Sequence, residues 1–361
     1  MSRLRCVSRV AAFVVFALLA TDLPSIAIAS CIWNQVYVPA DLISISAIGP
    51  SDIWADGDGP VFGTVLHHWN GAQWTSLQVP LPTQDAYSRS ISAVADDDIW
   101  AAGSYTNNVG EVQPYAIHWN GRRWVLTTLA LETRTAGISN PIRAFAPNDV
   151  WAVGNFGSYY FSEHWDGARW KTVYFASLPG AEIDALDGTS SNDLWAAGRR
   201  PYSRSIIPLI EHFNGTRWKI VNAPAINTAQ LYGLHAQSPT DAWGVGYYYD
   251  ASPKHPARTF IEHWDGASWT VVPSPNFDWP SRELVNQLGA VGASSTDDAW
   301  AVGSVGGVGL LAMHWDGTAW TIPERPPALG PGGFASVVDL SPHDAWAVGG
   351  TVADSWCFAT P

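Results

Sequence analysis

The sequence predicts an all-β protein built from a repeated four-stranded unit, and three observations lead to this prediction. The 361-residue chain contains 21 tryptophans, and all but Trp279 lie on one pattern: Asp-x-Trp-[Ala/Gly]-x-Gly, then usually His-Trp-[Asp/Asn]-Gly-x-x-Trp. The first motif returns seven times at intervals of roughly 45–57 residues, a period typical of repeat architectures. The Asp-Gly or Asn-Gly pair of the second motif is the usual sequence of a tight β-hairpin turn. The tryptophans of the first motif are Trp54, Trp100, Trp151, Trp195, Trp243, Trp300 and Trp346.

Each unit is expected to contain four short strands. A run of small apolar residues, such as 45–48, precedes the first motif and suits a crowded strand next to a central axis. Trp-Ala-Val-Gly opens the second strand, and the third ends at His-Trp, as in 261–264. The fourth begins at the last tryptophan of the unit, as in 269–272, and ends in a Pro-rich loop. Four strands repeated seven times predict a seven-bladed β-propeller.

The two ends of the chain are expected to complete each other. The seventh unit stops shortly after Trp356, and the segment 33–39 near the N-terminus has the sequence of its missing fourth strand. When this composite unit is aligned with the others, Cys357 falls at the position of Asp265 and Cys31 at that of Ala267. These positions lie on the two sides of a hairpin turn, at a separation that suits a disulfide.

The first 29 residues have the features of a secretory signal. Three arginines precede a short apolar run at 10–20, and small residues at Ala27 and Ala29 suit cleavage. The apolar run is too short for a membrane span. We expect residues 1–29 to be a signal peptide and residues 30–361 to be a single secreted propeller domain. An alternative is open, because 28–31 also resembles a lipobox in which Cys31 would carry a lipid anchor; Asp22 and Pro24 count against it.

Charge and motifs exclude several classes of function. The net charge is −13 and only three lysines occur, so the chain has no electrostatic footprint for nucleic acid or anionic lipid. No Gly-x-Ser-x-Gly, His-Glu-x-x-His or phosphate-loop motif occurs, so we expect no cofactor and favour a non-enzyme. We also expect a monomer.

No metal site is expected. The repeated histidines come one per unit and cannot converge on one ion, so we expect each to bond the repeated aspartate of the first motif. The segment 56–59, Asp-Gly-Asp-Gly, resembles the start of a calcium loop but lacks its remaining ligands.

These motifs resemble those of secreted bacterial propellers of the dispase autolysis-inducing protein type, and more distantly kelch and Asp-box propellers. The resemblance covers nearly the whole mature chain and implies the fold; it says little about function, because propellers host many functions. The turn at Asp265–Trp269 is one residue shorter than an Asp-box turn. Propeller lectins also suggest sugar pockets between the units, although buried core is the expected role of the repeated tryptophans.

The candidate ligand-binding residues lie where the repeat is broken, on long loops of the fourth to sixth units. These loops are expected on one face, where they bring together aromatic, cationic and acidic side chains. The candidates are Arg199, Arg200, Arg204, Tyr247, Tyr248, Tyr249, Asp250, Arg258, Asp278, Trp279 and Arg282. Aromatic platforms beside polar groups suit a sugar ring or a peptide anchor. The simpler alternative is that these loops pack only on themselves.

We favour a secreted, non-catalytic binding protein for a carbohydrate or an extracellular protein held on this face. One alternative is a glycan-active enzyme, such as a sialidase, hydrolase or lyase, with a carboxylate pair drawn from Asp250, Asp278 and Glu283. Another is an interaction partner of an exoprotease or of the cell wall. A ligand in the central channel is a further possibility, because Arg143, Asp184 and His235 are placed to face the axis.

We predict that Cys31 and Cys357 form a disulfide, which an oxidising compartment permits. The chain-entropy model gives roughly 5–6 kcal/mol for so long a loop, so reduction should lower the melting temperature. Peptide mass spectrometry with and without reduction measures the bond. A free thiol on Cys357, or a lipid mass on Cys31, would contradict it.

Overall fold

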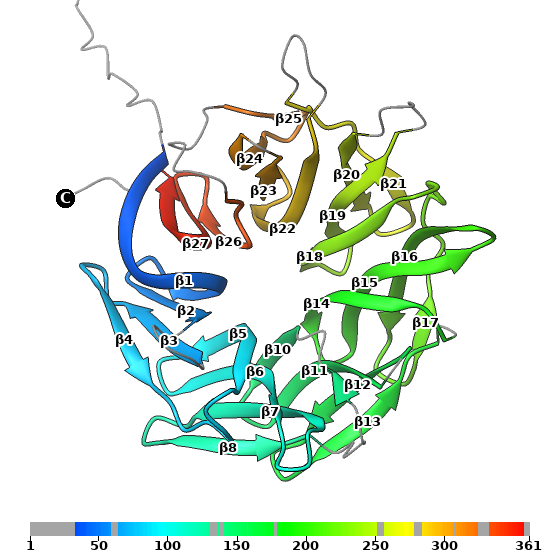
Figure 1. The fold of residues 1–361 in the computed structure, drawn as a ribbon. Coiled ribbons are helices and arrows are strands. Elements are labelled where there is room, and N and C mark those ends of the chain that lie inside the picture. The colour runs from blue at the N-terminus through cyan, green and yellow to red at the C-terminus, as the bar shows by residue number, and fades with distance from the viewer. Residues whose placement is uncertain are drawn as a thin grey trace, which may run out of the picture. The chain divides into compact units, whose positions relative to one another are not determined.

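The computed structural model describes residues 33–58, 64–129, 136–137, 141–156, 158–176, 179–250, 256–277, 284–306, 308–323 and 332–356. Every regular element among these residues is a strand, and the strands form antiparallel sheets arranged around a central axis (Figure 1). No helix in this part of the chain has the length and hydrophobicity needed to cross a membrane. The all-β propeller of four-stranded antiparallel sheets is thus confirmed.

Five sheets follow the chain order of one unit each. The second unit contains β5 (Tyr87–Ala95), β6 (Asp98–Thr106), β7 (Val112–Trp119) and β8 (Trp124–Thr128). The third contains β10 (Ile142–Ala146), β11 (Asp149–Phe156), β12 (Tyr159–Trp165) and β13 (Trp170–Tyr174), with the short β9 (Ala136–Gly137) paired to β11. The fourth contains β14 (Glu182–Ser190), β15 (Asp193–Tyr202), β16 (Ser205–Phe213) and β17 (Trp218–Ile220). The fifth contains β18 (Gln230–Ser238), β19 (Asp241–Tyr249), β20 (Ala257–Trp264) and β21 (Trp269–Val271). The sixth contains β22 (Asn286–Ser295), β23 (Asp298–Val305), β24 (Gly309–Trp315) and β25 (Trp320–Thr321).

The structure corrects the predicted number of blades: it has six sheets, not seven. The first and seventh repeats share one six-stranded sheet, in the order β26 (Ser336–Ser341), β27 (Asp344–Trp356), β1 (Trp33–Gly49), β2 (Asp52–Asp58), β3 (Thr64–Trp69) and β4 (Trp74–Gln78). The first part of β1 pairs with β27, where Trp33 faces Trp356, and its second part pairs with β2. Because β1 runs on as one long strand, backbone pairing joins the two repeats (blue and red in Figure 1). The N-terminal strand therefore pairs with the C-terminal strand, as the motif alignment predicts. The predicted disulfide stays a prediction, because Cys31 and Cys357 lie outside the described residues.

The tryptophans of the first motif form the core between neighbouring units, as predicted. Trp243 is almost completely buried and packs against Trp315 and Trp320 of the next unit, with ring centroids 5.2 Å apart in both pairs. The same contact closes the ring, because Trp346 of the last unit packs against Trp69 of the first at 5.1 Å. Apolar burial on this scale is the main favourable contribution to folding.

The repeated histidines bond the repeated aspartates, which confirms their predicted structural role. In each of six units the histidine Nε2 lies 2.6–2.9 Å from the aspartate Oδ1. The imidazole also lies on the tryptophan of the motif; in the second unit His118 and Trp100 stack with centroids 3.9 Å apart. Among the described residues, no three His, Cys, Asp or Glu side chains are grouped to hold a metal ion.

Side chains link the innermost strands around the axis. Ser44 and Ser46 of β1 accept hydrogen bonds from backbone N–H groups of β5, and Ser90 and Ser92 of β5 accept them from β10. Elsewhere the backbones approach directly: a Cβ added to Gly233 of β18 would lie 2.7 Å from the Cα of Ala290 in β22. These contacts hold the innermost strands close together and set the width of the central space.

We predict that Glu262→Met stabilises the protein, and more so at higher pH. Both Glu262 oxygens are buried without a hydrogen-bond partner among the described residues, and burial raises the pKa of this carboxyl to about 8. A raised carboxyl pKa favours folding at low pH, and that contribution is lost as pH rises toward the folded pKa. Met313 occupies the same register position in the sixth unit. The gain in unfolding free energy should be about 3 kcal/mol larger at pH 8 than at pH 5, measured by chemical denaturation.

A matched control is Glu211→Met at the same register position in the fourth unit. The Glu211 carboxylate accepts a hydrogen bond from the Ala176 N–H at 2.7 Å. Its replacement should destabilise the protein, because it removes this part-buried hydrogen bond. Equal effects of the two substitutions would contradict this explanation.

Candidate functional site

A charged cluster lies where the fourth and fifth units meet. Arg199 of β15 faces Glu182 across the strand pair and donates to the same carboxylate oxygen from Nε at 2.9 Å and from Nη2 at 2.5 Å. Its Nη1 donates to Gln230 of the next sheet at 2.8 Å. Arg199, which the sequence singled out, is therefore held in place by residues of two sheets.

Three tyrosines extend this cluster to the surface. Tyr247 is almost buried and stacks on Tyr232, with centroids 5.7 Å apart at an interplanar angle of 25°. Tyr249 packs edge-on against Tyr247 at 5.5 Å. Tyr232 and Tyr249 are 37% and 43% exposed. We call Tyr232, Tyr247 and Tyr249 the aromatic patch.

Tyr232 was missed by sequence reasoning because it lies in a regular innermost strand rather than in a long loop. Strand register could have found it: Gln230, two residues earlier, pairs with Tyr247. Residues two apart on a strand share a face, so the register places Tyr232 on the same side of the sheet as Tyr247, although a bulge lies between Leu231 and Gly233.

Strand alternation separates some of the other candidates from the aromatic patch. Tyr248 points to the opposite side of its sheet and packs edge-on against Phe260, and Arg258 is its cross-strand partner. Arg200 follows Arg199 on β15 and projects to the other side of its own sheet. Arg204 lies at the exposed tip of the β15–β16 hairpin, and Asp250 is exposed at the end of β19. Asp278, Trp279, Arg282 and Glu283 lie outside the described residues.

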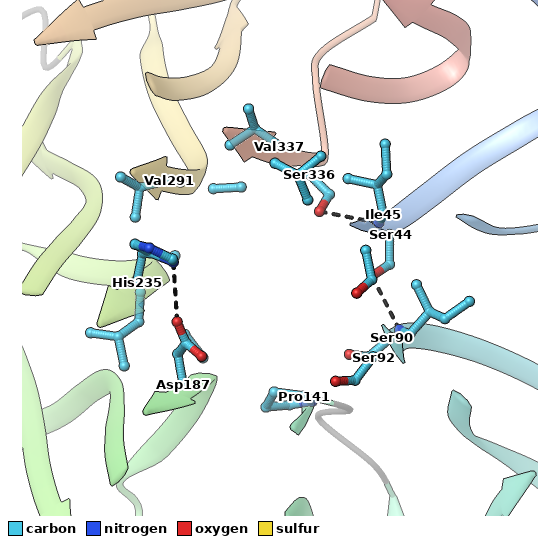
Figure 2. Close-up of a pocket in the computed structure, with 18 of the residues that line it drawn as sticks. Ser44, Ile45, Ser90, Ser92, Pro141, Asp187, His235, Val291, Ser336 and Val337 are labelled. Atoms are coloured by element: carbon cyan, nitrogen blue, oxygen red, sulfur yellow. Dashed lines mark hydrogen bonds and ion pairs between the residues drawn. The ribbon is translucent and has the colours of Figure 1, made fainter. Parts of the chain in front are cut away.

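A cavity of about 540 Å³ lies on the axis, lined by the innermost strands. Asp187 on β14 is its most buried charge and is held from three sides: by Arg143 Nε at 2.9 Å, by His235 Nδ1 at 3.2 Å and by the Ala236 N–H at 3.0 Å. Figure 2 shows Asp187 and His235 on one wall and Ser44, Ser90, Ser92 and Ser336 on the opposite wall. The three residues predicted to face the axis, Arg143, Asp184 and His235, all line this cavity.

Asp184 connects the cavity to the charged cluster. It lines the cavity together with Tyr232 of the aromatic patch. Burial, and then the nearby Glu182 carboxylate, raise the pKa of Asp184 to about 6, while Arg199 acts in the opposite direction. The carboxyl therefore changes its charge near neutral pH. The aromatic patch, the charged cluster and the cavity form one continuous site across the fourth and fifth units.

The comparisons with known proteins support the fold alone. No family model matches the chain, and no curated protein matches it either. YCF48 bound to a D1 peptide is similar over 91% of this chain and 97% of its own, with a TM-score of 0.58 and 14% identity. A GH74 xyloglucanase from Xanthomonas campestris is similar over 92% of this chain and 55% of its own, with a TM-score of 0.59 and 14% identity. An Aleuria aurantia lectin in complex with Fucalpha1-6GlcNAc is similar over 82% of this chain and 99% of its own, with a TM-score of 0.51 and 14% identity.

We predict that Asp184 titrates near pH 6, and that its neighbours shift the titration in opposite directions. Glu182→Gln should lower the pKa by removing a like charge, and Arg199→Gln should raise it by removing an opposite charge. Carboxyl-carbon NMR of the three proteins measures the titration. An unshifted pKa near 4 in the native protein would contradict the burial of this group.

Proposed function

We propose that the protein is a non-catalytic carbohydrate-binding propeller whose ligand rests on the aromatic patch beside Arg199 and Glu182. The observation that carries this proposal is the pairing of exposed tyrosine rings with a fixed ion pair. A sugar ring offers an apolar face to an aromatic platform and hydroxyl groups to charged hydrogen-bond partners.

The site is organised before any ligand binds. Arg199 is held by Glu182 and Gln230, and Tyr247 is held between the other two tyrosines. A pre-organised site loses less side-chain entropy on binding than a mobile loop does. The known structures with this fold include a lectin bound to a fucosylated sugar and a xyloglucanase, which is consistent with carbohydrate binding. The fold is also that of a protein solved with a bound peptide, so an extracellular protein is the alternative ligand.

We predict that Tyr249→Ala weakens oligosaccharide binding roughly tenfold, because it removes the outer ring of the platform. A glycan array followed by calorimetry on the best ligand measures the effect. Tyr174→Ala is the matched control: this tyrosine is 71% exposed on β13, outside the patch, and its loss should leave binding unchanged. Equal losses in the two variants, or capture of secreted proteins but of no glycan, would refute the proposal.

A glycan-active enzyme is the second candidate, and Asp184 favours it. A carboxyl with a pKa near 6 beside a second carboxylate has the protonation behaviour of a general acid. Catalysis would also require the two carboxyl groups to flank a bound glycosidic bond. The titration of Asp184 is the first test of this candidate, and an ordinary pKa at that residue removes it.

We also infer that the protein is exported and acts as a monomer. The support for export is the charged and apolar pattern of residues 1–29. The motif alignment also predicts a disulfide between Cys31 and Cys357, which an oxidising compartment would permit. For the location, the alternative is a lipid anchor on Cys31. For the role, the alternative is an interaction with an exoprotease or the cell wall.

A further inference from the structure

The axial cavity is rich in hydrogen-bond donors along one wall. Ser44, Ser46, Ser90, Ser92 and Ser336 each accept a backbone N–H from the adjacent innermost strand at 3.0–3.3 Å. A hydroxyl oxygen that accepts a hydrogen bond still carries a proton to donate. No acceptor for these protons is recorded in the described part of the chain, and all five residues line the cavity. This wall therefore presents an arc of O–H donors (Figure 2).

The opposite wall carries positive charge. His235 Nδ1 contacts Asp187, and its Nε2 lies 3.2 Å from the Gln237 Oε1. The Gln237 amide is oriented by its donation to the Ser294 carbonyl, so the oxygen faces the imidazole. Both ring nitrogens then face acceptors, and only an imidazolium donates from both. Hydrogen bonding to Asp187 accordingly raises the pKa of His235, although burial opposes the shift.

The charges in the cavity do not cancel. Asp187 carries one negative charge, forms ion pairs with Arg143 and His235, and accepts a hydrogen bond from the Ala236 N–H. Arg143 and His235 carry two positive charges, and the exposed Arg89 on β5 adds a third at the cavity lining. Two other acids line the cavity. Burial and the nearby Asp298 raise the pKa of Asp339 to about 9, which keeps it neutral. Asp184, whose pKa is about 6, is neutral only below that pH. Below about pH 6 the cavity therefore carries more positive than negative charge, in a chain whose net charge is −13.

We propose that this cavity is a carboxylate-binding subsite that receives the acidic terminal sugar of a glycan lying on the aromatic patch. The inference rests on the proposed carbohydrate function. Its geometric support is continuity, because Tyr232 belongs to the patch and also lines the cavity. The volume of about 540 Å³ lies within the usual range for small-ligand sites. Because the protein as a whole is acidic, it disfavours long polyanionic ligands. The proposed ligand therefore carries a single carboxylate, on the terminal sugar of the glycan.

Binding is expected to be stronger at lower pH. Asp184 is faced by Glu182, Arg199 and Tyr160, and loses its negative charge below about pH 6. His235 is faced by Asp187, Arg143 and Gln237, and its pKa is raised because the hydrogen bond and charge of Asp187 outweigh the effect of burial. A uronic acid stays ionised there, so its affinity should rise roughly tenfold between pH 8 and pH 5.5.

The test is calorimetry with three probes: methyl glucuronide, methyl glucoside and N-acetylglycylglycine, which carries a peptide carboxylate. The native protein should bind the glucuronide at least roughly tenfold more tightly than the glucoside. Arg89→Gln should reduce this preference severalfold. The double variant Arg143→Gln/Asp187→Asn removes the half-buried ion pair as a unit, and should also reduce the preference because the guanidinium of the cavity wall is lost. Circular dichroism melting checks that each variant folds.

The Tyr249→Ala variant separates this inference from the proposed function. It should lose affinity for neutral oligosaccharides and keep the preference for glucuronide over glucoside. A native protein without that preference, or a preference unchanged in both cavity variants, overturns the subsite even where neutral glycans bind the patch. Equal affinity for the peptide carboxylate overturns the assignment to a sugar.

Discussion

The contact on which the structure depends is the packing of one unit's tryptophan against the next unit's pair of aromatic rings. It repeats from Trp100 with Trp165 and Trp170 to Trp346 with Trp69 and Trp74, where it joins the end of the chain to its beginning. An indole buries about 150–250 Å², which corresponds to about 4–6 kcal/mol per contact at the usual coefficient. The histidine–aspartate pair beside it orients the ring, because the imidazole stacks on the indole while bonding the aspartate.

Because these contacts are nearly alike around the ring, the axis is where the units can differ. The innermost residues directly opposite the tryptophans share one register level; they are Ser46, Ser92, Arg143, Asp187, His235, Gly292 and Val338. Two hydroxyl groups are followed by three charged side chains and then by two positions with no polar side chain. A regular scaffold thus places an irregular set of side chains at a single level, and this asymmetry gives the cavity a charged side.

Equivalent positions in different units also differ in how much a buried carboxyl group destabilises the fold. Glu211 and Glu262 occupy equivalent register positions, yet only Glu211 has a recorded backbone donor, the Ala176 N–H. Ala176 lies six residues after Trp170, and the residue six after Trp218 is Pro224, which has no N–H to offer. Burial without a partner then raises the pKa of Glu262. Repeat proteins tolerate such positions because each unit contributes its own share of the stability.

The sequence by itself determined the strand order within a unit, the hairpin turns, the buried tryptophans, the histidine–aspartate pairs and the pairing of the two chain ends. Each depends on residues close in sequence or on a motif repeated often enough to align. It also singled out Arg199, Tyr247 and Tyr249, because they lie where the repeat is broken, and Arg143, Asp184 and His235, because their positions in the repeat face the axis.

Only the tertiary structure decided the rest. Six sheets are found instead of seven because β1 pairs with β27 and β2 as one strand, which a motif count does not reveal. Asp187 contacts Arg143, which lies 44 positions before it, and His235, which lies 48 positions after it. The alternation of residues along a strand predicts on which face of the sheet a side chain lies. Which residues of other units it contacts depends on how all the sheets are arranged around the axis.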